Sequence, residues 1–217
     1  MDQDAARRTA AQLARPSGDG GIAITTSMNT TNAFVTERAL EALELRSGDA
    51  WLEIGPGNAC LSADAVTSLG STGRYLGFEY NEEIATIARD TLAGCDADVE
   101  VRSGDFVDHG FEVGAFDALM GVNVVYFFDD IDAMVARCAS WLRPGGRLVF
   151  GIRSIRSLGA LPISAHGFNL RPVDDYFIAL HAAGFEAVGA TFHDEGTTTL
   201  GDDVIAVDSI VISAALS

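Results

Sequence analysis

The stretch Ala50-Trp-Leu-Glu-Ile-Gly-Pro-Gly-Asn-Ala-Cys60 constrains the fold of this chain more than any other. Its apolar start predicts a strand over residues 51–54, and the glycines predict a tight turn into a helix over residues 59–69. Gly55 and Gly57 allow positive φ and carry no Cβ, so a ligand can lie against bare backbone at the carboxyl end of the strand. The stretch predicts a nucleotide-type site, although a Gly-x-Gly turn by itself can also serve only as a bend.

A carboxylate two residues before the first glycine indicates which nucleotide fits. Glu53 would meet the pyrophosphate of a dinucleotide unfavourably, because that group sits at the helix amino terminus. S-adenosylmethionine carries an ammonium and a sulfonium group and no phosphate, so a carboxylate suits it. We therefore expect S-adenosylmethionine as the cofactor, with Glu53, Gly55, Gly57 and Asn58 around it.

Two runs carry a resemblance to a known family. Leu52-Glu-Ile-Gly-Pro-Gly57 resembles the first motif of the class I S-adenosylmethionine-dependent methyltransferases, with Ala59 at the position of a third glycine. Leu142-Arg-Pro-Gly-Gly-Arg-Leu148 resembles a structural turn of the same family. The resemblance covers residues 34–213. It implies an α/β fold with a Rossmann-like, seven-stranded, mostly parallel sheet, helices on both faces and a C-terminal antiparallel β-hairpin. A helix is expected over residues 82–92, and the alternation of residues 185–193 and 204–213 suggests the two strands of the hairpin.

An acid after the second expected strand, residues 74–78, has the spacing of a ribose ligand. Glu79 stands 22 residues after Gly57, and its carboxylate can accept hydrogen bonds from both ribose hydroxyls. Tyr80 follows and could pack against the adenine face, with edge packing as the alternative. The resemblance further implies that Asp105 binds the adenine amino group and that Phe106 lies alongside the ring; a plain Gly-Asp turn is the alternative.

The exit of the strand expected within residues 116–128 should face the methyl donor, because ligands bind beyond the carboxyl ends of strands in open α/β sheets. Asn123 is expected at the cofactor and Tyr126 at the acceptor. His166 lies in the irregular segment 153–171, which is a candidate for part of the acceptor pocket. A methyl transfer requires no universal catalytic residue, so none is assigned, and the three cysteines have no metal-ligand spacing.

The amino-terminal part, residues 1–33, is expected to be separate from a methyltransferase domain over residues 34–217. A short helix should end at Pro16, followed by a flexible break over residues 17–21 and a polar segment over residues 22–32. In related small methyltransferases such a segment folds over the active site as a lid, and a plain linker is the alternative. The domain should then begin with a helix over residues 34–45.

The net charge and the lack of long apolar runs indicate which partners and which cellular location to expect. The formal net charge of −17 repels phosphate backbones, which argues against nucleic acid as a substrate. The chain contains no lysine, which fits either adaptation to high salt or a GC-rich genome. No apolar run is long enough to span a bilayer, and the first residues lack an apolar signal core. We expect a cytoplasmic monomer or homodimer that acts on a small-molecule acceptor, without a metal or a membrane partner.

Two other functions stay open at this level. A non-catalytic protein that binds S-adenosylmethionine or S-adenosylhomocysteine would show the same motifs, because every strong motif concerns the cofactor. An NAD-dependent oxidoreductase is the other alternative, and Glu53, Asp105 and the expected terminal hairpin argue against it.

Overall fold

Seven strands form one sheet in the computed structural model, which describes residues 2–200 and 203–217. Their order across the sheet is β3-β2-β1-β4-β5-β7-β6. The strands are β1 Ala50–Ile54, β2 Arg74–Glu79, β3 Asp98–Ser103, β4 Phe116–Val122, β5 Leu142–Arg153, β6 Phe185–Leu200 and β7 Asp203–Leu216. Strands β1 to β5 run parallel, whereas β7 is antiparallel to β5 and β6. The predicted fold class is confirmed.

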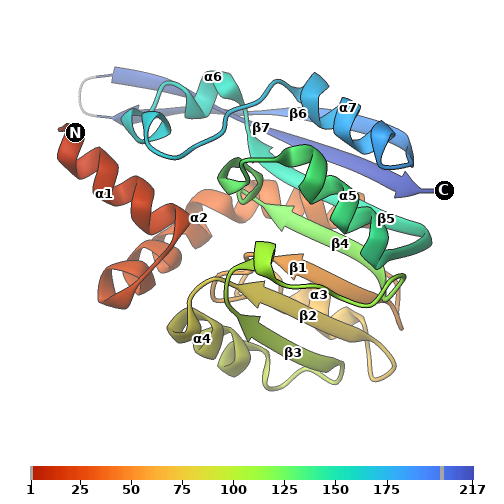
Figure 1. The fold of residues 1–217 in the computed structure, drawn as a ribbon. Helices are drawn as coiled ribbons and strands as arrows, with labels where there is room; N and C mark the ends of the chain where they lie inside the picture. Colours follow the sequence, from red (N-terminus) through yellow and green to blue (C-terminus); the bar gives the residue numbers. More distant parts are fainter. Residues whose placement is uncertain (1, 201–202) are drawn as a thin grey trace.

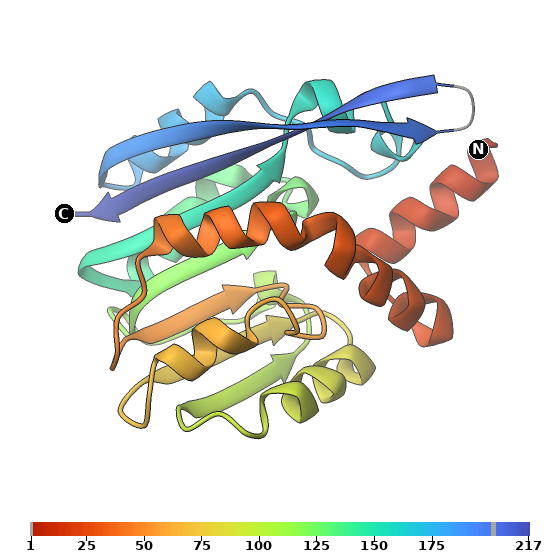
Figure 2. The same ribbon diagram turned by 180° about the vertical axis from the view of Figure 1, so that it is seen from behind.

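Helices cover both faces of the sheet (Figures 1 and 2). One face carries α2 Gly18–Leu43, α3 Ala63–Ser68 and α4 Glu82–Leu92; the other carries α5 Ile131–Trp141 and α7 Val173–Ala182. Shorter helical segments join them: α6 Ile155–Leu158, η1 Phe106–Asp108, η2 Val125–Phe127 and η3 Pro162–Ala165. Within the described residues, no helix combines the length and the apolarity that crossing a membrane requires.

The alternation of side chains along β1 separates two hydrophobic cores. Leu52 and Ile54 join the core beneath α5 and α7, whereas Trp51 joins the core beneath α2, α3 and α4. Side chains two residues apart share one face of a strand. Glu53 has the parity of Trp51 and therefore points into the second core.

The amino-terminal segment differs from expectation. Helix α1, Gln3–Ala14, forms as predicted, but α2 is continuous from Gly18 to Leu43, so the flexible break and the polar linker do not occur. A Cβ on Gly21 would lie 2.9 Å from the carbonyl carbon of Pro16, so glycine here permits close packing after the turn. Buried Val35 and Leu43 anchor the other end of α2. Tertiary packing thus extends the helix through residues with weak helix propensity.

Two further boundaries were predicted incorrectly. The helix expected over residues 59–69 is confined to α3, because Ala59 has φ +58° and a turn replaces its first residues. The hairpin strands run beyond the expected 185–193 and 204–213, with residues 201–202 between them outside the described part. Helix α1 and the first half of α2 lie beyond the carboxyl ends of β1 to β4, which places them over the expected site (Figures 1 and 2).

Candidate functional site

A cavity of about 940 Å³ opens at the carboxyl ends of the parallel strands. Its walls come from the ends of β1, β2 and β4, from η1 and η2, from α1 and α2, and from η3 and β7. Open α/β sheets bind ligands at this edge. Single ligand pockets measure about 300–1,000 Å³, so this cavity can accommodate a nucleotide-sized ligand and part or all of a second small molecule.

The glycine turn forms one wall of the cavity, as predicted. Gly55 has φ +68°, and a Cβ there would lie 2.5 Å from Cγ1 of Val124. Gly57 has φ +58°, and a Cβ there would lie 3.1 Å from Cγ2 of Thr25 in α2. Both positions require glycine, because left-handed backbone and close neighbours oppose any side chain.

Glu79 ends β2 and lines the cavity with a fixed carboxylate. Its Oε2 accepts a hydrogen bond from the backbone N of Gly57 at 3.1 Å, and its Oε1 accepts one from the backbone N of Asn81 at 3.2 Å. Burial raises the pKa of Glu79, although these backbone hydrogen bonds lower it. The acid and the glycine turn, 22 residues apart in sequence, are joined directly at the cavity.

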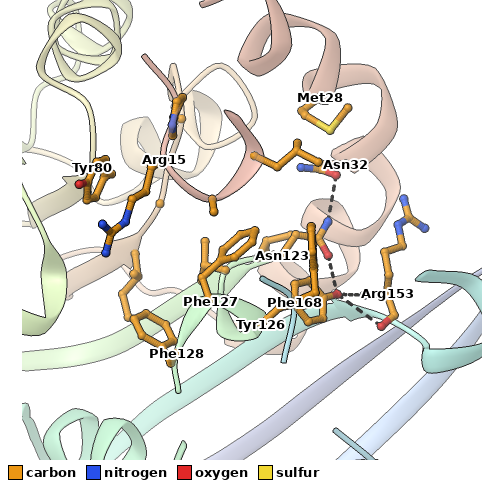
Figure 3. Close-up of a pocket in the computed structure, with 18 of the residues that line it drawn as sticks. Arg15, Met28, Asn32, Tyr80, Asn123, Tyr126, Phe127, Phe128, Arg153 and Phe168 are labelled. Atoms are coloured by element: carbon orange, nitrogen blue, oxygen red, sulfur yellow. Dashed lines mark hydrogen bonds between the residues drawn. The ribbon is translucent and has the colours of Figure 1, made fainter. Parts of the chain in front are cut away.

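Tyr80, Asp105 and Phe106 line the same end of the cavity. Asp105 caps η1 by accepting a hydrogen bond from the backbone N of Val107 at 3.1 Å, and Phe106 is buried among aromatic rings. The guanidinium of Arg15, which was not predicted as a site residue, lies 5.2 Å from the Tyr80 ring centroid (Figure 3). It also lies 3.4 Å from Oδ2 of Asp105. The predicted adenine contacts are therefore brought together, with an arginine against them.

Asn123 and Tyr126 lie beyond the end of β4, also as predicted. Asn123 has φ +55°; its Nδ2 donates to Oδ1 of Asn32 at 2.9 Å, and its Oδ1 accepts from the Tyr126 hydroxyl at 3.0 Å (Figure 3). The Tyr126 hydroxyl also accepts a hydrogen bond from the backbone N of Arg153. Burial raises the pKa of Tyr126, so its hydroxyl stays protonated and serves as a hydrogen-bonding group.

Arg153 connects three parts of the chain at the cavity. Its guanidinium pairs with Glu195 of β6 and donates to the carbonyl of Thr31 in α2. Both charged side chains are largely buried, with 10% and 13% of their surface exposed. Asn32, Arg153 and Glu195 were not predicted as site residues. Each contacts a partner that is distant in sequence, so no local sequence pattern indicates the contact.

Three predicted residues are not brought to the cavity. Glu53 accepts hydrogen bonds from Ser62 Oγ at 2.8 Å and Tyr75 Oη at 2.7 Å, inside the core beneath α2, α3 and α4. Burial raises its pKa to about 7, although the two hydrogen bonds lower it. The structure therefore places Glu53 outside the described lining of the cavity, because its place in the strand alternation directs it into that core.

Asn58 and His166 are the other two. The side chain of Asn58 accepts a hydrogen bond from the backbone N of Cys60 at 3.2 Å, so it stabilises its own turn. His166 ends η3 and is half-buried outside the lining. Indeed, none of the four histidines of the chain is among the described residues that line the cavity.

Comparison with known proteins agrees with this geometry. Residues 52–150 match the model of a family described as "Methyltransferase domain". The nocamycin O-methyltransferase of Saccharothrix syringae is 33% identical over 116 residues, which are 52% of this chain and 41% of that protein. The chain spans 32–41% of the length of this and two further curated relatives, well under half of each.

Solved structures share the fold. A chain in the complex of the Haloferax volcanii Trm112 methyltransferase activator with a methyltransferase is 17% identical, with a TM-score of 0.71 over 95% of this chain and 96% of that one. A geranyl diphosphate methyltransferase in complex with S-adenosylmethionine is 19% identical, with a TM-score of 0.69 over 95% and 94%. At these identities the likeness establishes the fold alone. Residues 52–150 are thus similar to a methyltransferase domain, within a fold that the chain shares with methyltransferases of known structure.

Proposed function

We propose that this protein transfers the methyl group of S-adenosylmethionine to a small-molecule acceptor. The contact between Glu79 and the backbone of Gly57, in the wall of a cavity large enough for both reactants, carries the proposal. The name of the Saccharothrix relative, an O-methyltransferase for nocamycin, supports a small acceptor. The net charge of −17 argues in the same direction, because it disfavours nucleic-acid acceptors.

The residues fit the proposed cofactor. The bare backbone of Gly55 and Gly57 leaves room for a ligand close to the strand end. Glu79 has one hydrogen bond from the backbone on each carboxylate oxygen, and an ionised carboxylate has about four acceptor sites, so it can still accept from two ribose hydroxyls. Asp105 and Tyr80 offer an acceptor and a ring face for adenine.

When bound, S-adenosylmethionine supplies a methyl carbon activated by sulfonium: a lone pair of the acceptor bonds to this carbon, the carbon–sulfur bond breaks, and its electron pair stays on sulfur. The chain contributes orientation and exclusion of water. Asn123, held by Asn32 and Tyr126, orients groups near the end of β4. Helices α1 and α2 cover the cavity, and we propose that residues 1–33 act as its lid.

A calorimetric titration with S-adenosylhomocysteine tests the cofactor assignment. We expect micromolar binding to the wild type, weakened in Glu79→Ala and in Asp105→Ala by about 1–3 kcal/mol, the usual cost of losing a partner of a buried polar group. Glu112→Ala is the matched control, because Glu112 is exposed and lies outside the cavity lining. No binding to the wild type at millimolar ligand would refute the proposal.

A cofactor-binding protein without catalysis is the second candidate. The observation that favours it concerns histidine and tyrosine: no histidine is among the described residues of the lining, and the Tyr126 hydroxyl is already hydrogen-bonded. Transfer of a tritiated methyl group to members of a panel of phenols, amines and thiols would exclude it. Tight S-adenosylhomocysteine binding with no transfer to any of them would support it.

A further inference from the structure

The two ends of the cavity differ in chemistry. Glu79, Tyr80 and Asp105 give the proposed cofactor end its polar groups. The opposite end, which we call the acceptor end, is walled by six apolar side chains from α2, η2, the η3 region and β7. They are Met28, Phe127, Leu161, Ile163, Phe168 and Ile205. Figure 3 shows Met28, Phe127 and Phe168 around Asn123, away from Arg15 and Tyr80.

Aromatic rings dominate one side of the acceptor end. The centroids of Phe127 and Phe168 are 5.0 Å apart with 57° between the ring planes, and those of Tyr126 and Phe168 are 5.9 Å apart with 43° between them. Aromatic pairs at such separations stabilise each other by about 0.5–1.5 kcal/mol beyond the area they bury. An aromatic ring of a bound molecule can make the same kind of contact with these three side chains.

Among the described residues of the lining, no arginine is free to pair with an anionic group at the acceptor end. Of the three arginines in that lining, Arg153 is paired with Glu195 and Arg137 donates to the carbonyls of Val107 and His109. The third, Arg15, lies at the cofactor end, beside Tyr80 and Asp105. The chain has no lysine. A phosphate or carboxylate buried at the acceptor end would lose its hydration without gaining a counterion, which is costly in an apolar site.

We infer that the acceptor is an uncharged, ring-bearing apolar molecule that binds against Phe127 and Phe168, with its nucleophilic atom toward Asn123. The inference rests on the proposed function and specifies its substrate class. No histidine is among the described residues of the lining, and the proton on the attacked atom passes to water as the new bond to the methyl carbon forms. Phenols and thiols lose their proton to water more easily than alcohols do, so we expect the acceptor to carry one of these two groups.

Binding to the protein saturated with S-adenosylhomocysteine tests the inference with matched probes. We expect 2-naphthol to bind in calorimetry and 2-naphthoate, of the same ring system, to bind at least about tenfold more weakly, because its carboxylate finds no counterion. Equal or tighter binding of 2-naphthoate would overturn the inference. Failure of S-adenosylhomocysteine itself to bind would instead refute the proposed function, so the two failures are distinct.

Two substitutions test the role of the rings. Phe168→Leu keeps an apolar side chain and removes the ring, so it should weaken 2-naphthol binding by about twofold to tenfold and leave S-adenosylhomocysteine binding unchanged. Met28→Ala changes the opposite wall and should weaken 2-naphthol binding if Phe168→Leu does not fold. Ile178→Leu is the control, since Ile178 is 66% exposed on α7 and outside the lining. Unchanged 2-naphthol affinity in the folded variants would overturn the inference.

Discussion

The guanidinium of Arg15 lies 3.4 Å from the carboxylate of Asp105, the group expected to bind the adenine amino group. The same guanidinium lies 5.2 Å from the centroid of the Tyr80 ring, the expected adenine platform. In the proposed cofactor site, adenine and Arg15 would therefore compete for the same two partners. Cofactor entry requires that the end of α1 move or that Arg15 turn away.

Substitution Arg15→Ala should tighten S-adenosylhomocysteine binding by a few-fold. The gain is limited, because an ion pair this exposed contributes only about 0.2–1 kcal/mol. Arg8→Ala, an exposed arginine of the same helix, is the control for charge in calorimetry. Weaker binding in Arg15→Ala would mean instead that Arg15 holds the cofactor.

Replacing Gly55 by alanine should both destabilise the protein and abolish cofactor binding. The left-handed backbone costs about 1–2 kcal/mol for a residue with a Cβ, and the contact with Val124 adds to this cost. In chemical denaturation, Gly110→Ala is the matched control, because nothing lies within 4 Å of a Cβ there. Adding Val124→Ala to Gly55→Ala should restore only the part of the lost unfolding free energy that comes from the contact with Val124. Full restoration would contradict the role of backbone conformation.

The stability of the protein should carry a pH dependence from Glu53. Its folded pKa, about 7, lies above the ordinary 4.5, so the folded state holds this proton more tightly than the unfolded state. The stabilisation is therefore complete below about pH 4.5 and is lost as pH rises through 7, by roughly 3 kcal/mol for a shift of this size. The free energy of unfolding of the wild type relative to Glu53→Gln should fall from pH 5 to pH 8, and a constant difference would contradict this.

Removing the ion-pair partner of Arg153 should change the relative affinities of the acceptor end for 2-naphthoate and 2-naphthol. Glu195→Gln removes the counterion of a largely buried guanidinium, so 2-naphthoate should bind at least about threefold more tightly than it binds to the wild type, with 2-naphthol little changed. Glu186→Gln, an exposed position of the same strand, is the control. No gain for 2-naphthoate in a folded Glu195→Gln variant would show that Arg153 does not reach the acceptor.

Local sequence predicts those elements that local chemistry delimits. Helix α4 has the predicted bounds because the side chain of Asn81 caps its start, accepting from Ile84 N at 3.0 Å, and apolar residues recur at helical spacing. Glu79 and Asp105 could be placed because Glu79 is the last residue of β2 and Asp105 comes two residues after β3, and the sheet aligns both strand ends with the glycine turn.

The remaining features depend on distant partners. Helix α2 continues through a polar, threonine-rich segment because both its ends are packed, which no window of sequence reveals. The pairs Asn32–Asn123 and Arg153–Glu195 join residues 91 and 42 positions apart. Glu53 was assigned to the ligand from its motif position, whereas the strand alternation, readable from Trp51, gives its true direction.

The two ends of the cavity are built from different parts of the sequence. The proposed cofactor contacts at Gly55, Gly57, Glu79 and Asp105 lie within the matched residues 52–150. The acceptor end, apart from Phe127, is built from segments on either side of that range. Under the proposed function, substitutions in those outer segments alter which molecule receives the methyl group while the donor site keeps its geometry. Such a protein can diversify its products without rebuilding its sheet.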